Sequence, residues 1–308
     1  MRTAVYESRL SLSHRVPVGH PEHPGRHAAI KAALADLPGL GWREPAPGHI
    51  DQVRRFHTPD HVDRILHALP EFGPDVQLDA DTHLSTDSPA AGLMAVGSAC
   101  AAVDAVMAGE LDAGFILARP PGHHAEPNRP MGFCLFNTVA CAALHALDVQ
   151  GLDRVAIVDI DVHHGNGTQC LSERDERVLF ASLHQAPLYP GTGSPGETGL
   201  NGNVVNVQLR EGLSGLAWRG AFEAGVIPAL KAFKPEFLFV SAGFDAHVDD
   251  PLAGLQLRDA DYAWAGERLA GLAKECASSR LVSVLEGGYD CDALGRSVRS
   301  YLTAIEAV

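Results

Sequence analysis

The chain has 308 residues, of which 46% are hydrophobic and 20% are charged. This composition is typical of a globular protein and excludes an intrinsically disordered chain. The formal net charge is −14 and the sequence contains no run of Lys or Arg, which argues against a nucleic-acid-binding surface and favours a cationic small molecule or a lysine-rich peptide as partner.

The sequence gives no sign of export or membrane insertion. Residues 1–10 lack the apolar stretch and the small-residue cleavage site of a signal peptide. No stretch approaches about 18 uninterrupted apolar residues, so we expect no membrane-spanning segment. The six cysteines are scattered and form no CxxC pair. We therefore expect reduced thiols in a cytoplasmic protein, without a zinc–thiolate site.

Short apolar runs along the chain are predicted to be β-strands. Several are apolar at consecutive positions, which is typical of parallel strands buried on both faces. In chain order the predicted strands are Thr3–Tyr6, Gly114–Ala118, Val155–Ile160, Val178–Ser182, Val204–Gln208, Phe237–Ser241 and Leu281–Leu285.

Longer helical patterns separate these runs. One helix is expected to begin at Asp87 and to end at Gly109. A second is expected to begin at Ser214, with a kink at Pro228, and a third at Asp259. The alternation of strands and helices predicts one α/β domain over residues 1–308, with three layers and a mostly parallel central sheet. Ligands of such sheets bind beyond the carboxyl ends of the strands.

The first chemical motif follows the predicted strand Val155–Ile160. Alternate residues of an extended chain share a face, so Asp159, Asp161 and His163 should point the same way. Two buried carboxylates at close range repel each other, and a divalent cation relieves this repulsion most simply. The competing interpretation is a strand end held by salt bridges, for which no basic partner is evident nearby.

A second strand end supplies a further acid at Asp245. With Asp161 and His163 it would form a three-ligand site with room for a water molecule, which is the pattern of an open catalytic zinc site. Asp249 and Asp250 are interpreted as loop and cap residues. His247 is expected to be a loop residue facing solvent.

Two more motifs add groups for acid–base and oxyanion chemistry. His123 and His124 follow a Pro-Pro-Gly turn, and a histidine beside a metal-bound water is a natural general base. Tyr289 follows two glycines and could donate a hydrogen bond to an oxyanion, although a packing role is equally consistent with the sequence. Phe133 and Tyr189 could form the walls of a narrow slot, or belong to an ordinary core.

Together these segments resemble the histone deacetylase family, within the arginase/deacetylase superfamily. They occur in the order typical of the family and extend over nearly the whole chain. The matching segments are HPEHPGR (20–26), RPPGHHA (119–125), GFCLFN (132–137), VDIDVHHGNGT (158–168), YPGTG (189–193), SAGFDAHVDDPLAG (241–254) and LEGGYD (285–290).

The resemblance implies a zinc-dependent hydrolase that removes an acetyl or other acyl group from an amine. It implies one Zn²⁺ held by Asp161, His163 and Asp245. The residues that it assigns to catalysis are His123, His124, Tyr289, Asp159, which would accept a hydrogen bond from His123, and Asn166, which would pair with His124. Asparagine at position 166 resembles the class II branch and the bacterial-type histone deacetylase-like amidohydrolases.

The same resemblance implies a substrate channel and a second cation site. The channel would be lined by Phe133, Tyr189, Leu252, Gly132 and Gly287. A monovalent cation, K⁺ or Na⁺, would bind at Asp159, Ser182 and Leu183.

The resemblance favours acyl-lysine, in a peptide or a small acylated amine, as the substrate. Leu252 lacks the charge that polyamine-selective relatives carry near the pocket mouth, although the acidic surface keeps acetylpolyamine open as a second substrate class. An arginase-like enzyme with two manganese ions, iron(II) in place of zinc, and a non-catalytic binder of acyl-amines are also compatible with parts of this pattern. A homodimer or homotetramer is expected from relatives, with no nucleic-acid or membrane partner.

Overall fold

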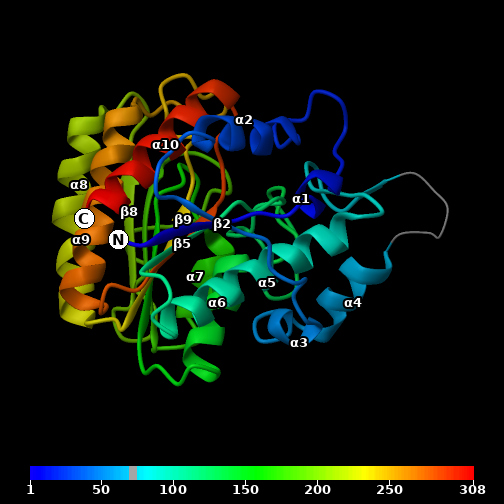
Figure 1. Cartoon of the computed structure of the whole chain (residues 1–308), viewed down its shortest axis with the longest axis horizontal. Helices are drawn as coiled ribbons and strands as arrows, with labels where there is room; N and C mark the ends of the chain where they lie inside the picture. The colour runs from blue at the N-terminus through cyan, green and yellow to red at the C-terminus, as the bar shows by residue number, and fades with distance from the viewer. Residues whose placement is uncertain (69–74) are drawn as a thin grey trace.

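The computed structural model describes residues 1–68 and 75–308, in which eight strands form one parallel sheet (Figure 1). The strand order is β2-β1-β5-β10-β9-β6-β7-β8, and every pairing between neighbours in this sheet is parallel. The strands are β1 (Thr3–Tyr6), β2 (Gly41–Arg43), β5 (Ala113–Ile116), β6 (Val155–Asp159), β7 (Val178–Gln185), β8 (Val204–Leu209), β9 (Phe237–Ala242) and β10 (Leu281–Leu285). A short antiparallel pair, β3 (Val76–Gln77) and β4 (His83–Leu84), lies apart from it.

Helices cover both faces of the sheet. Figure 1 shows α2, α8, α9 and α10 on one side and α5, α6 and α7 on the other. Each side encloses its own hydrophobic core, with Trp218 and Tyr301 in the first and Val103 and Val139 in the second. The helices are α1 (Leu10–Ser13), α2 (Gly25–Leu34), α3 (Ile50–Val53), α4 (Pro59–His67), α5 (Ser88–Met107), α6 (Thr138–Asp148), α7 (Asn166–Ser172), α8 (Gly215–Phe233), α9 (Asp259–Cys276) and α10 (Cys291–Ala307).

This architecture confirms the predicted α/β domain with three layers and a mostly parallel sheet. The predicted strands all occur, with ends that differ by a few residues, such as β7, which continues to Gln185. The edge strand β2 was not predicted, because its three residues Gly41–Arg43 are only partly buried or exposed and carry no apolar run. Edge strands give a weak hydrophobic signal for this reason.

The predicted helices also occur, with one local difference. Asp87 precedes α5 as expected, but its side chain makes no capping hydrogen bond. Ser214 does cap α8, where its side chain accepts a hydrogen bond from Ala217 N–H. The helix α8 runs on through Pro228, which is exposed to solvent, and the kink at this residue stays a prediction.

Helix α5 is long and apolar enough to cross a membrane by composition alone. Most of its length is buried inside the fold, where it packs on α6 and on strand β5. A helix that is buried on several sides is apolar all round, so the position of α5 in the fold explains its apolar composition.

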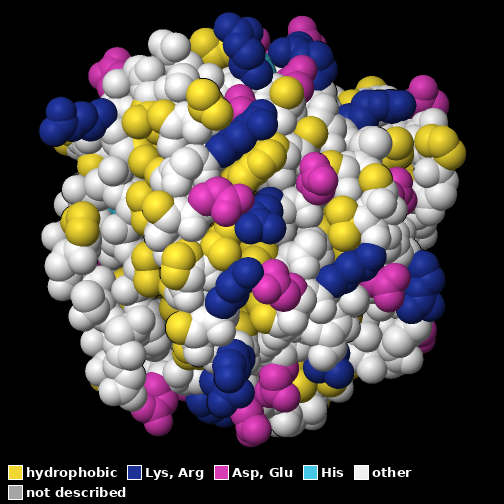
Figure 2. Space-filling view, turned by 90° about the vertical axis from the view of Figure 1, so that its left-hand side faces the viewer, with side chains coloured by type: hydrophobic (Ala, Val, Ile, Leu, Met, Phe, Trp, Pro, Cys, Tyr) yellow, Lys and Arg dark blue, Asp and Glu magenta, His cyan; other side chains and the backbone are white. Residues whose placement is uncertain are grey.

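The outer face over α8 and α9 carries charges of both signs. Figure 2 shows Lys and Arg side chains interspersed with Asp and Glu across this face, with hydrophobic side chains between them. Pairs such as Arg268 with Glu223 and Lys231 with Glu275 connect the two helices. Mixed charge of this kind is typical of a solvated surface.

The sheet order brings the four chemical motifs to adjacent positions. Strands β5, β10, β9 and β6 are neighbours in the middle of the sheet, and each is followed by one motif. Because the strands are parallel, their carboxyl ends lie at one edge of the sheet, and the loops that follow them meet there.

Close backbone packing at Gly97 gives a stability prediction. A Cβ on this residue of α5 would lie 2.3 Å from Gly48 N and 2.8 Å from the Ala46 carbonyl oxygen. We expect Gly97→Ala to lower the free energy of unfolding by about 1–3 kcal/mol, although alanine is the better helix former.

Urea denaturation measures this effect. Gly220→Ala in α8 is the matched control, because its new Cβ would meet no heavy atom within 4 Å. That variant should be neutral or more stable by about 0.5–1 kcal/mol. Equal effects of the two substitutions would contradict the close approach at Gly97.

Candidate active site

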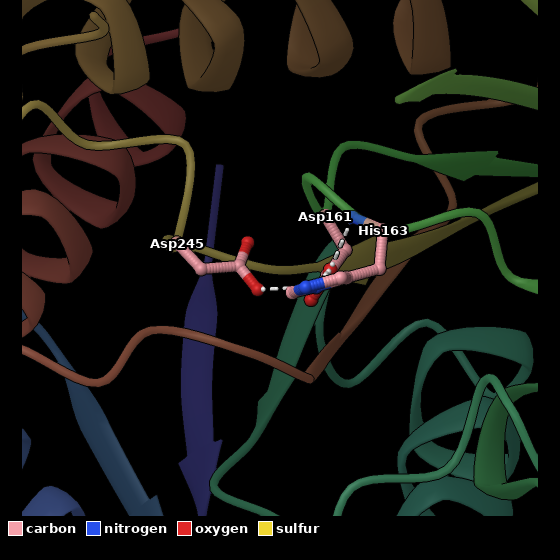
Figure 3. A group of neighbouring side chains, drawn as sticks. All are labelled: Asp161, His163 and Asp245. Carbon is pink, nitrogen blue, oxygen red and sulfur yellow. Dashed lines mark hydrogen bonds and ion pairs between the residues drawn. The ribbon is translucent and has the colours of Figure 1, made fainter. Parts of the chain in front are cut away.

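Two aspartates and one histidine converge where β6 and β9 end. Asp161 and His163 follow β6, and Asp245 follows the neighbouring β9. Figure 3 shows the His163 imidazole between the carboxylates, with Nδ1 lying 3.0 Å from Asp161 Oδ1 and 3.1 Å from Asp245 Oδ2. One ligand atom from each residue lies within 4.8 Å of the others, and all three residues are buried. The structure thus brings the three predicted metal ligands together.

Backbone N–H groups hold the two carboxylates in place. Val162 N–H donates to Asp245 Oδ1 at 2.9 Å, and Gly287 N–H donates to Asp161 Oδ2 at 2.7 Å. A Cβ on Gly287 would lie 2.0 Å from Asp245 Oδ2 and 2.6 Å from Asp161 Oδ2. Gly287, which the resemblance assigned to the channel, therefore lies against the carboxylates, where only glycine fits.

The electrostatics at this point favour a bound cation. Burial raises the pKa of Asp245 to about 7, and the charge of Asp161 adds to this effect. Burial alone would lower the pKa of His163, but hydrogen bonds to Asp161 and Asp245 raise it to about 10. The raised pKa of His163 reflects the negative charge of the two carboxylates. Carboxylate oxygen and imidazole nitrogen are donors that zinc takes in open catalytic sites, so this donor set fits a divalent ion.

The two histidines after β5 are buried beside this group and have different partners. His123 Nδ1 lies 3.0 Å from Asp159 Oδ2, and His124 Nδ1 lies 2.9 Å from Asn166 Oδ1. Burial alone would lower the pKa of His123, but Asp159 and Asp161 raise it to about 10. Burial lowers the pKa of His124 well below its ordinary value. His123 thus holds a proton, whereas His124 is neutral and can accept one.

Glu286 is a buried acid that sequence reasoning missed. Its Oε2 accepts hydrogen bonds from Gly122 N–H at 2.7 Å and from His123 N–H at 3.1 Å, so it ties the histidine loop to β10. Burial raises its pKa to about 7. Its place between the apolar strand β10 and two glycines was the available signal, because an acid at a buried strand end needs a partner.

Arg26 holds the glycine turn that carries Tyr289. Its guanidinium donates to the carbonyl oxygens of Gly288, at 2.6 Å, and of Glu286. The guanidinium carbon lies 5.0 Å from the centre of the Tyr289 ring, within the range of a cation–π contact. Asp250 accepts a hydrogen bond from Tyr289 N–H at 2.7 Å. The tyrosine is thus fixed through its backbone and its ring.

A fully buried salt-bridge network supports Arg26. Glu22 Oε1 lies 3.0 Å from Arg26 and 2.6 Å from Arg119 Nε, and these three side chains have no solvent exposure. The sequence pattern assigned no role to Glu22, Arg26 or Arg119, although each lies in a quoted motif. Glu22 and Arg26 are four residues apart, but Arg119 lies 97 positions from Glu22, so no local pattern indicates the whole network.

A cavity of about 250 Å³ opens above the metal-ligand group. Its lining includes His124, His163 and Tyr289, together with the predicted channel residues Phe133, Tyr189, Gly132 and Leu252. Asp81 and Leu188, which were not predicted, complete the lining. The Phe133 and Tyr289 rings meet edge to face, with centroids 5.8 Å apart. The cavity is therefore narrow, largely aromatic, and carries one carboxylate besides the catalytic groups.

Two other predicted positions behave differently. His247 is buried, with Nε2 lying 3.2 Å from Asp259 Oδ1, so the expectation that it faces solvent is wrong. The loop folds back onto the start of α9, a contact that sequence alone did not indicate. Asp159 and Ser182 are register partners on β6 and β7, next to Leu183, and Ser182 Oγ lies 2.9 Å from His184 Nδ1. A monovalent cation there stays a prediction.

Comparisons with known proteins indicate the family to which the chain belongs. Residues 20–305 match the histone deacetylase domain. An uncharacterized protein of Synechocystis sp. is 43% identical over 301 residues, which cover 96% of each chain. A histone deacetylase-like amidohydrolase of Pseudomonas aeruginosa is 38% identical over 279 residues, which cover 88% of this chain and 73% of that protein.

A solved structure is similar over nearly the whole chain. The crystal structure of the HDA15 HD domain matches with a TM-score of 0.91 and 34% sequence identity, over 99% of this chain and 91% of that one. The domain match, the relatives and the shared fold lead to one conclusion: the chain belongs to the histone deacetylase family, as a hydrolase of the arginase/deacetylase fold.

Proposed function

We propose that this protein is a zinc-dependent amidohydrolase that removes acetyl or other acyl groups from acyl-lysine or a related small acylated amine. The observation that carries the proposal is the buried Asp161, His163 and Asp245 group, whose ligand atoms lie within 4.8 Å of one another. It lies at a cavity that also contains a neutral histidine and a tyrosine.

The proposed hydrolysis needs a base that accepts a proton from water and a donor that stabilises the oxyanion of the acyl carbonyl. A zinc ion held by Asp161, His163 and Asp245 would supply Lewis-acid polarisation and make the attacking water more acidic. His124 takes the proton of that water, because its Nδ1 is engaged by Asn166 and its Nε2 remains as the base. Tyr289 donates a hydrogen bond to the developing oxyanion. His124 then returns the proton to the leaving amine.

Tyr289 and His123 are suited to these parts by their protonation. Burial raises the pKa of Tyr289 well above its ordinary value, so the phenol keeps the proton that it donates. The protonated His123 beside Asp159 contributes positive charge close to Asp161, 3.9 Å away. That charge stabilises the negative oxyanion as it forms.

The cavity shape supports a linear acylated amine. Phe133 and Tyr189 are two of the aromatic side chains in its lining, and an aliphatic amine stem fits between such walls. Leu252 offers no charge for a second ammonium group, which favours acyl-lysine. Acetylpolyamine is the second candidate, because Asp81 adds a carboxylate to the same lining and the chain has a net charge of −14.

The proposal includes a second cation site, a cellular location and an oligomeric state. We propose that K⁺ or Na⁺ binds at Asp159, Ser182 and Leu183. We also propose that the protein is cytoplasmic, forms a homodimer or homotetramer, and has no nucleic-acid or membrane partner.

A non-catalytic acyl-amine binder is the competing hypothesis from another class of function. It is disfavoured because the base His124 and the donor Tyr289 both line the cavity.

The decisive experiment is an amide-hydrolysis assay on the zinc-loaded protein. We expect release of acetate from a fluorogenic acetyl-lysine peptide, loss of that activity after treatment with a chelator, and recovery when zinc is returned. Parallel reactions with acetylspermidine and longer acyl-lysines establish the substrate class. Binding of these amides without turnover of any of them would replace the enzyme with the acyl-amine binder.

Gly287→Ala tests the metal site without removing a ligand. The new methyl group would overlap both carboxylates, so we expect zinc affinity to fall by about 10–100-fold. Competition with a chromogenic chelator measures this affinity. Gly271→Ala in α9 is the control, since its Cβ would meet no heavy atom within 4 Å. Unchanged zinc affinity in Gly287→Ala would place the metal elsewhere.

Tyr289→Phe tests the oxyanion donor. Loss of one hydrogen bond that forms in the transition state should lower kcat by about 10²–10³ with little change in KM. Tyr262→Phe is the control, because Tyr262 is buried but is not among the residues that line the cavity. Near-normal turnover by Tyr289→Phe would remove the tyrosine from the mechanism.

A further inference from the structure

The Asn166 amide lies between a histidine and an acid. Its Oδ1 lies 2.9 Å from His124 Nδ1, and its Nδ2 donates to Glu126 Oε1 at 2.9 Å. Two weaker contacts reach the same nitrogen, from the His124 carbonyl oxygen and Met131 Sδ, each at 3.4 Å. Each end of the amide therefore has a close polar partner.

The orientation of this amide decides which nitrogen of His124 carries the proton. An asparagine amide has nearly the same shape in both orientations, so packing does not distinguish them. With the carbonyl toward His124, Nδ1 must carry the proton and Nε2 is left free to accept one. The reverse orientation would present an N–H₂ group to Nδ1, move the ring proton to Nε2 and disable His124 as a base.

Glu126 favours one orientation only. A carboxylate accepts hydrogen bonds and cannot donate, so it pairs with the N–H₂ end of Asn166 and not with the carbonyl end. Arg129 Nη2 lies 3.0 Å from the same oxygen and forms an ion pair with it. The Glu126 backbone is fixed by its N–H bond to the Arg129 carbonyl, at 2.9 Å, and by His57.

We propose that Glu126 is a positioning residue that orients the Asn166 amide and thereby sets His124 in the tautomer with Nε2 free. Glu126 acts through Asn166 and does not itself reach the cavity lining. The effect on turnover rests on the proposed hydrolysis, whereas the effect on the tautomer does not. A hydrogen bond to a charged group is strong enough to hold one amide orientation.

The tautomer is measured directly by long-range ¹H–¹⁵N NMR of the histidine rings in the zinc-loaded protein, with His124 assigned by its substitution. We expect Nδ1 of His124 to carry the proton in the wild type. Glu126→Ala should move part of the His124 population to the Nε2–H form. A wild-type Nε2–H tautomer, or an unchanged tautomer in Glu126→Ala, would overturn the proposal.

The second test measures the kinetics of variants in which the amide and the carboxylate of this contact are interchanged. Asn166→Asp would place two carboxylates where a hydrogen bond of 2.9 Å now lies, so this variant should lose turnover. Adding Glu126→Gln supplies an amide donor at that contact. We expect Asn166→Asp with Glu126→Gln to exceed Asn166→Asp alone by about tenfold in kcat at similar KM.

Glu223→Gln is the matched control, because Glu223 is also paired with an arginine, Arg268, at 2.9 Å, but on the outer face of α8. It should change neither kcat nor the His124 tautomer, and it should not rescue Asn166→Asp. Equal or lower activity of the double variant would contradict the coupling. If the wild type hydrolyses no acyl-amine, the proposed function fails, and the NMR result still decides the role of Glu126.

Discussion

Two buried carboxylates that face one imidazole impose the main constraint on this structure. Asp161 and Asp245 leave β6 and β9 at the centre of the sheet, where water cannot solvate their charge. Backbone N–H groups donate hydrogen bonds to both carboxylates. The remaining negative charge of the two carboxylates raises the pKa of His163. The surrounding loops fix the positions of these carboxylates and form one cavity beside them.

The acids around this centre differ in role according to their partners. Asp159 faces His123 and keeps it protonated, whereas burial lowers the pKa of His124, whose hydrogen-bond partner is the neutral amide of Asn166. Two adjacent histidines thereby acquire opposite protonation states, one suited to stabilising negative charge and one to accepting a proton. The buried pairs of Glu22 with two arginines add rigidity below the turn of Tyr289.

Sequence reasoning succeeded where the signal was local. Consecutive apolar positions identified the parallel strands, and alternation along an extended chain placed Asp161 and His163 on one side. It failed where a partner comes from a distant segment. Glu286, the Glu22 network and the burial of His247 depend on contacts between loops that are far apart in the chain, and Asp81 reaches the cavity from the segment between β3 and β4. The short, exposed strand β2 left no pattern to detect.

The backbone approach at Gly287 limits how this catalytic centre can diversify. Any larger residue there would collide with Asp161 and Asp245, so the inner end of the cavity is invariant in shape as long as both acids are kept. Leu252, Leu188 and Asp81 line the cavity and do not belong to the metal-ligand group. We therefore expect substitutions at these three positions to alter the shape of the cavity, whereas a substitution at Gly287 would displace the two acids themselves.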